Sequence, residues 1–153
     1  MTFATPNSPR LLVIGGGPAG TSAATTAAAR GARVTVVEKD VIGGAAHLWD
    51  CIPSKTMTAS AVRIDSVRNA AKLGLVTEPG QMHTGNLSAR IKAITGDINA
   101  TLVDMLDSQG VDLVPGTGRV VDEHTAVAAT GEGEQTIPFD TLLVSTGSAP
   151  RVP

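Results

Sequence analysis

The sequence contains very little aromatic side-chain volume. Its 153 residues include no Tyr, two Phe and one Trp, so that aromatic residues make up 2% of the chain. A core this poor in rings has to be filled by Val, Ile, Leu and Ala, or by a large bound cofactor. Hydrophobic residues (42%) and charged residues (17%) occur at levels typical of a soluble globular protein, and the length suits a single domain.

Cysteine, basic charge and long apolar runs are also scarce. Cys51 is the only cysteine, which excludes a disulfide within the chain and fits a reducing compartment. The formal net charge of −2 gives no basic field for nucleic acid or an anionic membrane. No apolar run approaches the ~20 residues of a membrane span, and residues 1–9 are polar, without the apolar segment of a secretory signal. We therefore expect a flexible tail over 1–9 and a cytoplasmic protein.

The first forty residues have the pattern of a βαβ unit. Residues 10–14 are predicted to form a short buried strand that leads into a glycine-rich turn. Residues 21–30 are rich in Ala and predict a helix that stops at Gly31, and residues 33–38 predict a second strand rich in Val. Continuous apolar strands of this kind are typical of a parallel sheet buried on both faces.

Two longer helices are predicted in the middle of the chain. Apolar residues recur at helical spacing over residues 51–73 and again from residue 87 or 88 to 108. A loop with Pro79 and Gly80 separates the two segments, and Gly74 is expected to end the first helix.

The sequence beyond residue 110 changes to short β-type runs divided by turn residues. A last buried strand is expected over 139–145, ending at Thr146 and Gly147. The other runs suggest a small antiparallel meander, and they are residues 111–114, 118–121, 126–129 and 135–137.

Three glycines after the first predicted strand form the pattern Gly-x-Gly-x-x-Gly. Gly15 permits a tight turn, Gly17 lets a pyrophosphate approach the backbone at the helix N-terminus, and Gly20 lets helix and strand pack closely. Glu38 ends the second strand roughly 20 residues further on, where a carboxylate can accept hydrogen bonds from both ribose hydroxyls and repels a 2′-phosphate. The pattern therefore predicts a dinucleotide site that disfavours NADP, without separating FAD from NAD.

A second motif follows over residues 43–55, with the sequence GGAAHLWDCIPSK. Together with the glycine pattern, it resembles the flavin-binding start of the pyridine nucleotide-disulfide oxidoreductases, the family of dihydrolipoamide dehydrogenase, glutathione reductase and mercuric reductase. That family has Gly-Gly-x-Cys, four residues, and then Cys-[Ile/Val/Leu]-Pro-x-Lys. Here Ala46 stands where the first cysteine belongs, and Cys51 keeps the second.

Two later segments extend the resemblance to nearly the whole chain. Residues 114–118 resemble the Gly-x-Gly strand of the family, whose backbone contacts the adenine, with Gly118 as the expected contact. Residues 145–150 resemble its Ala-Thr-Gly-x-x-Pro turn, which closes over FAD. The fold that follows is α/β, with a Rossmann-like parallel sheet, helices and a small antiparallel β-meander, as an incomplete FAD-binding domain.

The resemblance implies roles for individual residues. Cys51 corresponds to the flavin-proximal cysteine, and Lys55 to the lysine beside flavin N5, where a cation stabilises negative charge on the reduced ring. These two are the catalytic candidates, and no metal ligands are expected. The expected FAD-binding residues are Gly15, Gly17, Pro18, Ala19, Gly20, Glu38, Lys39, Gly43, Gly44, Ala45, Cys51, Lys55, Gly118, Thr146, Gly147 and Ser148.

The residue types alone also allow simpler interpretations. Cys51 could be a small buried residue at a helix start, and Lys55 a solvated helix lysine. A single His47 without spaced ligands is better explained as a loop residue near the cofactor than as a metal ligand.

The implied function is that of the FAD-binding portion of an NAD(P)H-dependent oxidoreductase. Without the disulfide, electrons would pass to a diffusible acceptor, and a quinone is the first choice because members with a similar degenerate motif are quinone reductases. Alternatives are a soluble pyridine nucleotide transhydrogenase, a dihydrolipoyl dehydrogenase and a nucleotide-binding module without catalysis. We expect residues 10–153 to be the N-terminal segment of the FAD/NAD(P)-binding domain, inactive alone, with the NAD and dimerisation domains of a homodimer outside this chain.

Overall fold

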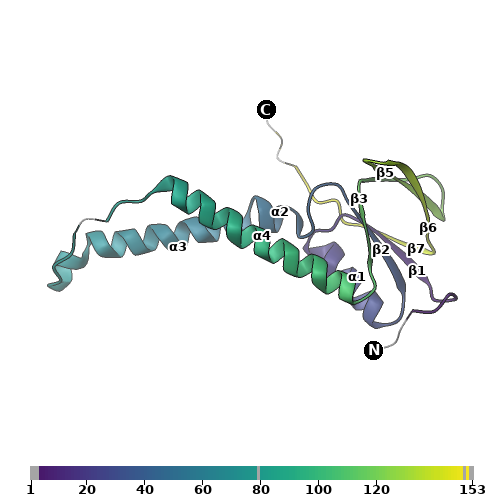
Figure 1. The fold of residues 1–153 in the computed structure, drawn as a ribbon, viewed down its shortest axis with the longest axis horizontal. Coiled ribbons are helices and arrows are strands. Elements are labelled where there is room, and N and C mark those ends of the chain that lie inside the picture. Colours follow the sequence, from purple (N-terminus) through teal and green to yellow (C-terminus); the bar gives the residue numbers. More distant parts are fainter. Residues whose placement is uncertain (1–3, 79, 150, 152–153) are drawn as a thin grey trace. The chain divides into compact units, whose positions relative to one another are not determined.

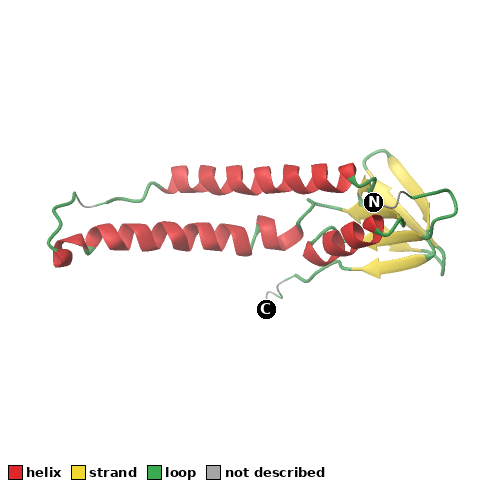
Figure 2. Cartoon of the chain, turned by 90° about the horizontal axis from the view of Figure 1, so that it is seen from below, coloured by secondary structure: helices red, strands yellow, loops and turns green. Residues whose placement is uncertain are grey.

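The computed structural model describes residues 4–78, 80–149 and 151. These residues divide into two compact units, each shown in Figures 1 and 2. The sheet unit comprises the described residues up to Ala45 and from Asn99 onward, and the helical unit comprises Ala46–Ile98. The two units are described separately below.

A four-stranded parallel sheet forms the centre of the sheet unit. Its strand order is β3-β2-β1-β7, and β2 and β7 pair with β1 on its two sides. This order follows from the crossover connections that parallel strands require. The strands are β1 (Arg10–Ile14), β2 (Arg33–Glu38), β3 (Asp112–Pro115) and β7 (Thr141–Val144).

Side chains alternate along β1 and so build a separate core on each face of this sheet. Leu12 and Ile14 pack with residues of the antiparallel sheet described below, whereas Val13 packs with residues of the helices. All three are buried, because both faces of the sheet are covered. The sheet unit therefore has three layers, and its core contains one aromatic ring, that of Phe139, among the described residues.

Helix α1 (Pro18–Ala29) packs against β1 and β2. It begins three residues before the predicted start, because Pro18 suits the first position of a helix, where its missing N–H costs nothing. Arg30 caps its C-terminus, and Gly31 follows with a φ of +84°, as the predicted stop requires. The glycine turn is thus joined directly to the helix N-terminus.

The antiparallel sheet has three strands and not the four runs expected from the sequence. It contains β4 (Thr117–Val120), β5 (Thr125–Thr130) and β6 (Gly133–Pro138), in that order. The first run became β3, which pairs in parallel with β2. The prediction was wrong for this run because it follows α4, which returns the chain to the parallel sheet as a crossover, and the turn at Gly116 then leads to the other sheet.

The helical unit consists of helices joined by short connections. Gly74 has a φ of +75° and caps the preceding 3₁₀ turn, as predicted. The second long helix begins at Thr84, earlier than expected, because Nδ1 of His83 accepts the N–H of Asn86 and so caps it. The elements are α2 (Gly44–Leu48, starting in the sheet unit), α3 (Cys51–Arg68), η1 (Ala70–Leu73) and α4 (Thr84–Ser108, whose part from Asn99 belongs to the sheet unit).

The helical unit buries almost no apolar side chain of its own. Ala70 is its only buried residue among those described, while Leu73 is 79% exposed and Val76 fully exposed. Helical propensity and hydrogen bonds therefore carry the stability of these helices, with little contribution from a core. None of the helices in the described part of the chain combines the length and the apolar character needed to cross a bilayer.

Candidate functional site

The turn between β1 and α1 brings two glycines of the motif into close contact. Gly15 has a φ of +106°, which favours glycine, and its N–H donates to the carbonyl oxygen of Val37 at 2.9 Å. A Cβ on Gly15 would overlap the carbonyl oxygen of Ser145, and a Cβ on Gly20 would overlap the carbonyl oxygen of Gly15. Both positions therefore require glycine for close packing of the backbone.

Gly17 differs from Gly15 and Gly20, because the position that a Cβ would occupy on Gly17 faces open space. Nothing lies within 4 Å of the position that its Cβ would occupy, and its φ of −70° is allowed for any residue. It is the N-cap of α1, where the N–H groups of Ala19 and Gly20 have no acceptor within the helix. The first turn also has no acidic residue. The open backbone and the positive end of the helix can therefore hold a phosphate.

Glu38 is oriented by two backbone groups. Its Oε2 accepts the N–H of Gly16 at 2.6 Å, and its Oε1 accepts the N–H of Asp40 at 2.8 Å. An ionised carboxylate has about four lone-pair sites, so that each oxygen can accept one more hydrogen bond. The side chain is thus fixed in place and still able to accept two hydroxyl groups.

A cleft of about 200 Å³ opens next to Glu38, at the carboxyl ends of the parallel strands. This edge is where ligands of α/β sheets bind. Of its lining residues, Gly15, Glu38, Lys39, Gly118 and Thr146 were expected from the sequence. The complete lining is Ile14, Gly15, Val37, Glu38, Lys39, Gly116, Thr117, Gly118 and Thr146.

Gly43 and Gly44 lie beside the glycine turn. The N–H of Gly43 donates to the carbonyl oxygen of Gly16 at 2.8 Å. Gly44 has a φ of +59°, and a Cβ on it would come within 3.0 Å of the Cα of Gly17. The expected loop residues, including the exposed Ala45, are therefore placed next to the α1 N-terminus.

The segment after β7 contributes one expected residue to the cleft. Thr146 lines it, whereas Gly147 (φ +71°) and Ser148 are exposed and not among its lining residues. Ser145, the first residue of the matched segment but not one of the expected binding residues, donates from Oγ to the carbonyl oxygen of Gly15 at 2.8 Å.

The residues of the second motif from Ala46 onward belong to the helical unit. Cys51 begins α3 with a free, exposed thiol, so its interpretation as a buried packing residue is wrong. Lys55 is exposed one turn later and lines a groove of about 720 Å³ within this unit, together with Arg63 and Arg90. The roles of Cys51 and Lys55 beside a flavin stay predictions.

Six residues that line the cleft or shape it were not among the expected binding residues, and two of them, Ile14 and Val37, are core residues of β1 and β2. Gly16 and Ser145 act through their hydrogen bonds to Glu38 and Gly15, which only the folded chain brings together. Gly116 and Thr117 belong to the predicted Gly-x-Gly segment over residues 114–118, of which only Gly118 was expected as a contact.

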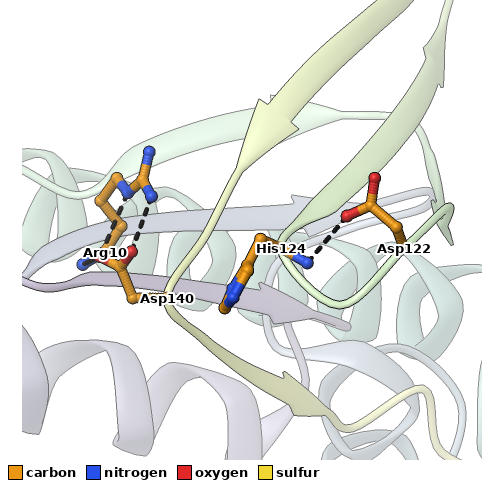
Figure 3. Close-up of polar contacts among 4 residues, drawn as sticks. All are labelled: Arg10, Asp122, His124 and Asp140. Atoms are coloured by element: carbon orange, nitrogen blue, oxygen red, sulfur yellow. Dashed lines mark hydrogen bonds and ion pairs between the residues drawn. The ribbon is translucent and has the colours of Figure 1, made fainter.

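An ion pair between Arg10 and Asp140 lies away from this cleft. Figure 3 shows Arg10, at the start of β1, donating to the carboxylate of Asp140, with Nη2 2.6 Å from Oδ1. The hydrogen bond from the Arg10 side chain lowers the pKa of Asp140 to about 2. Nearby, the backbone N–H of His124 donates to Asp122 and lowers the pKa of that carboxyl group. The Arg10–Asp140 pair joins β1 to the residue before β7, and the Asp122–His124 hydrogen bond lies within one turn. We therefore assign both contacts a structural role.

Two further features have little catalytic meaning. A larger cleft, of about 760 Å³, is lined by the first residues of β1 and β2, by β3 and by the β5–β6 hairpin. Ligands of parallel sheets bind at the other end of the strands. Within the described residues, no group of His, Cys, Asp and Glu side chains could hold a metal ion.

A glycine turn between strand and helix, an open helix N-terminus and an acid at the end of β2 together define a dinucleotide-binding α/β domain. The sequence pattern of the family described as "Pyridine nucleotide-disulphide oxidoreductase" matches residues 9–153. The chain belongs to this family and corresponds to its N-terminal FAD-binding region.

Relatives with assigned names are longer than this chain. It is 35% identical to a NAD(P)H dehydrogenase (quinone) of Mycobacterium tuberculosis over 94% of its length, and to a dihydrolipoyl dehydrogenase of Haloferax volcanii over 90%. It spans 31% and 30% of these relatives, respectively.

A solved structure confirms the fold class. The crystal structure of LpdA from Mycobacterium tuberculosis superposes with a TM-score of 0.84 at 34% identity, over 94% of this chain and 33% of that one. A Cu(II) complex of the flavoprotein disulfide reductase RclA from Escherichia coli has a TM-score of 0.77 at 24% identity, which shows the shared fold only.

Proposed function

We propose that this chain binds FAD and serves an NAD(P)H-dependent oxidoreductase that reduces a quinone, or a similar diffusible acceptor, without a redox disulfide. The observation that carries the FAD assignment is the cleft beside Glu38. It brings together residues from three predicted motifs, represented by Gly15, Gly118 and Thr146. The match of residues 9–153 to a family of pyridine-nucleotide oxidoreductases supports the redox class.

The residues of the sheet unit fit the parts of a dinucleotide. The N–H groups of Ala19 and Gly20, together with the open side of Gly17, suit the pyrophosphate. Glu38 suits the ribose, because its two oxygens are fixed and each can accept a further hydroxyl hydrogen. Gly118 packs closely on Ile14 in the wall of the cleft, where a Cβ would lie 3.1 Å from the Ile14 side chain. A flavin bound by these groups would supply the hydride acceptor for the reaction.

The absence of a disulfide narrows the class of acceptor. Cys51 is the only cysteine in the sequence, and Ala46 occupies the other cysteine position of the motif. A dithiol exchange needs two sulfur atoms, so a dihydrolipoyl dehydrogenase mechanism has no relay within this chain. The missing relay supports the quinone assignment, whereas sequence identity does not separate the two classes, since it is 35% to a NAD(P)H dehydrogenase (quinone) and 35% to a dihydrolipoyl dehydrogenase.

The cofactor proposal is tested by binding before turnover. The purified protein is titrated with FAD and with ADP by calorimetry, and its absorption spectrum is recorded after gel filtration. We expect both ligands to bind, with ADP as the simplest probe of the cleft. The FAD proposal would be overturned if the folded protein bound neither FAD nor ADP.

The acceptor is tested separately with NADH or NADPH under anaerobic conditions. Menadione, lipoamide and an NAD analogue are offered one at a time, with protein of the complete coding sequence. Menadione reduction without lipoamide reduction is the expected result. Transfer to the NAD analogue alone would favour the transhydrogenase alternative.

A nucleotide-binding module without catalysis is the second candidate. It requires only the nucleotide cleft beside Glu38 and neither a redox thiol nor an electron acceptor. FAD binding with no oxidation of NADH or NADPH by any acceptor would establish this alternative.

A further inference from the structure

One peptide group of the glycine turn is held from both sides by side chains. The carbonyl oxygen of Gly15 accepts a hydrogen bond from Oγ of Ser145 at 2.8 Å. The N–H of Gly16, the other polar group of the same peptide, donates to Oε2 of Glu38 at 2.6 Å. Since a peptide group is planar and rigid, these two hydrogen bonds fix a single plane.

We infer that Ser145 is a positioning residue of the nucleotide site, because its hydroxyl orients the Gly15–Gly16 peptide and, through it, the carboxylate of Glu38. This inference rests on the proposed function of the cleft. It adds a residue that the family pattern does not predict, since the motif resembled by this segment has Ala at the position of Ser145.

The peptide needs such support because its residues are flexible. Gly15, Gly16 and Gly17 follow one another, and glycine loses more backbone freedom on folding than any other residue. A rotation of the peptide plane would remove the donor that Glu38 Oε2 uses at present. The carboxylate would then lose one of the two backbone contacts that orient it.

Ser145 is itself held firmly enough to act as a support. It follows β7, and its N–H donates to the carbonyl oxygen of Ile14 at 2.8 Å, which continues the pairing with β1. Its hydroxyl has one hydrogen, and the Ile14 oxygen, at 3.4 Å, is the poorer acceptor. The short hydrogen bond to Gly15 therefore defines the rotamer.

Helix α1 limits the alternatives for the same carbonyl group. A Cβ on Gly20 would overlap the Gly15 oxygen and lie 2.9 Å from Oγ of Ser145. The carbonyl group is thus enclosed by Gly20 on one side and reached by the hydroxyl of Ser145. Loss of the hydroxyl would remove the side-chain donor to the Gly15 carbonyl oxygen and leave room for the peptide to turn.

The test combines ADP affinity with amide exchange at one residue. ADP binding is measured by calorimetry for the wild-type protein, Ser145→Ala, Glu38→Gln and the double variant. Exchange of the Gly16 amide is measured by NMR without ligand. Ser145→Thr keeps a hydroxyl group, and Ser88→Ala removes one from an exposed site on α4 where the described structure shows no hydrogen bond to it.

We expect Ser145→Ala to weaken ADP binding about 3- to 10-fold, the effect of one neutral hydrogen bond. Gly16 exchange should become faster, Ser145→Thr should stay close to the wild type, and the double variant should lose less than the product of the two single effects. The inference would be overturned if Ser145→Ala kept the Gly16 exchange rate and the ADP affinity of the wild type. It would also be overturned if the loss of ADP affinity in the double variant equalled the product of the losses in the two single variants. If the wild-type protein binds no ADP, the proposed function fails, whereas the exchange measurement still decides whether Ser145 holds the peptide.

Discussion

The carbonyl oxygen of Gly15 lies against the Cα of Gly20, so close that a methyl group on Gly20 could not be accommodated. This contact joins the end of β1 to the first turn of α1. Gly17, between them in sequence, has no atom within 4 Å of its open side. The same motif thus contains a glycine needed for packing and a glycine that leaves a surface open.

Alanine substitutions at these two positions should separate folding from binding. Gly20→Ala should lower the free energy of unfolding by about 1–3 kcal/mol, because the added methyl group overpacks the turn. Gly17→Ala should change it by less than about 1 kcal/mol, since its φ of −70° suits alanine. ADP binding should weaken in both variants, in Gly17→Ala because the methyl group occupies the space left open for a phosphate.

Urea unfolding and calorimetry with ADP measure the two effects. Gly131→Ala is the matched control, because that glycine also has nothing within 4 Å of its Cβ position but lies between β5 and β6, outside the lining of the cleft. Unchanged ADP affinity in Gly17→Ala would contradict the assignment of this surface to a phosphate.

Glu38 should determine the choice between nucleotides with and without a 2′-phosphate. Wild-type protein is expected to bind ADP at least about 10-fold more tightly than 2′-phospho-ADP, because the fixed carboxylate accepts hydroxyl groups and repels an added phosphate. Glu38→Gln should reduce this ratio, since it removes the negative charge but keeps the shape. Competition binding with both nucleotides gives the ratio, and an equal preference in the wild-type protein would argue against the ribose role.

Local patterns predicted much of the sheet unit. The apolar runs around Val13 and Val36 and the glycine turn between them identify a βαβ unit because each pattern is local. The run ending at Val114 was assigned to the wrong sheet, because a run of four residues with three apolar side chains fits either sheet and the pairing of Leu113 with Val36 decides. Helix α2 was missed because Gly43 and Gly44 indicate a turn more strongly than the few residues after them indicate a helix.

In the site, too, residues of local motifs could be predicted from the sequence, whereas a residue that acts through a distant partner could not. Glycine spacing and the acid at the end of β2 can be found in sequence, and the cleft brings Gly15 and Glu38 together. Ser145 could not be found in that way, because its partner Gly15 is 130 residues away in sequence. Its hydroxyl also departs from the pattern that identified the segment.

The ion pair of Arg10 and Asp140 should stabilise the sheet unit in a pH-dependent manner. Since the pKa of Asp140 is lowered from its ordinary 3.8 to about 2 in the folded protein, its stabilising effect is present above about pH 4 and is lost as the pH falls through about 2. Asp140→Asn should therefore be less stable than the wild type at pH 7, and this difference should shrink between pH 4 and pH 2. Both residues are partly exposed, so salt should weaken the difference as well.

Urea unfolding across this pH range measures the difference. Asp104→Asn is the control, because Asp104 is exposed on α4 and its carboxylate shows no hydrogen bond in the described part of the chain. A difference between wild type and Asp140→Asn that is as large at pH 2 as at pH 7 would show that the carboxylate charge is not responsible.

The single thiol provides the most direct test of electron transfer without a disulfide. Cys51 is exposed at the start of α3, and the sequence has no second cysteine with which it could pair. If electrons reach a quinone directly, Cys51→Ser should keep menadione reduction by NADH or NADPH within about 10-fold of the wild type, since removal of an obligatory covalent relay costs far more. Ala46→Cys restores the cysteine pair of the family motif. Menadione reduction by this variant is expected to be more sensitive to thiol-modifying reagents than menadione reduction by the wild type. Loss of menadione reduction in Cys51→Ser, with FAD still bound, would instead assign the remaining thiol an essential part in the reaction.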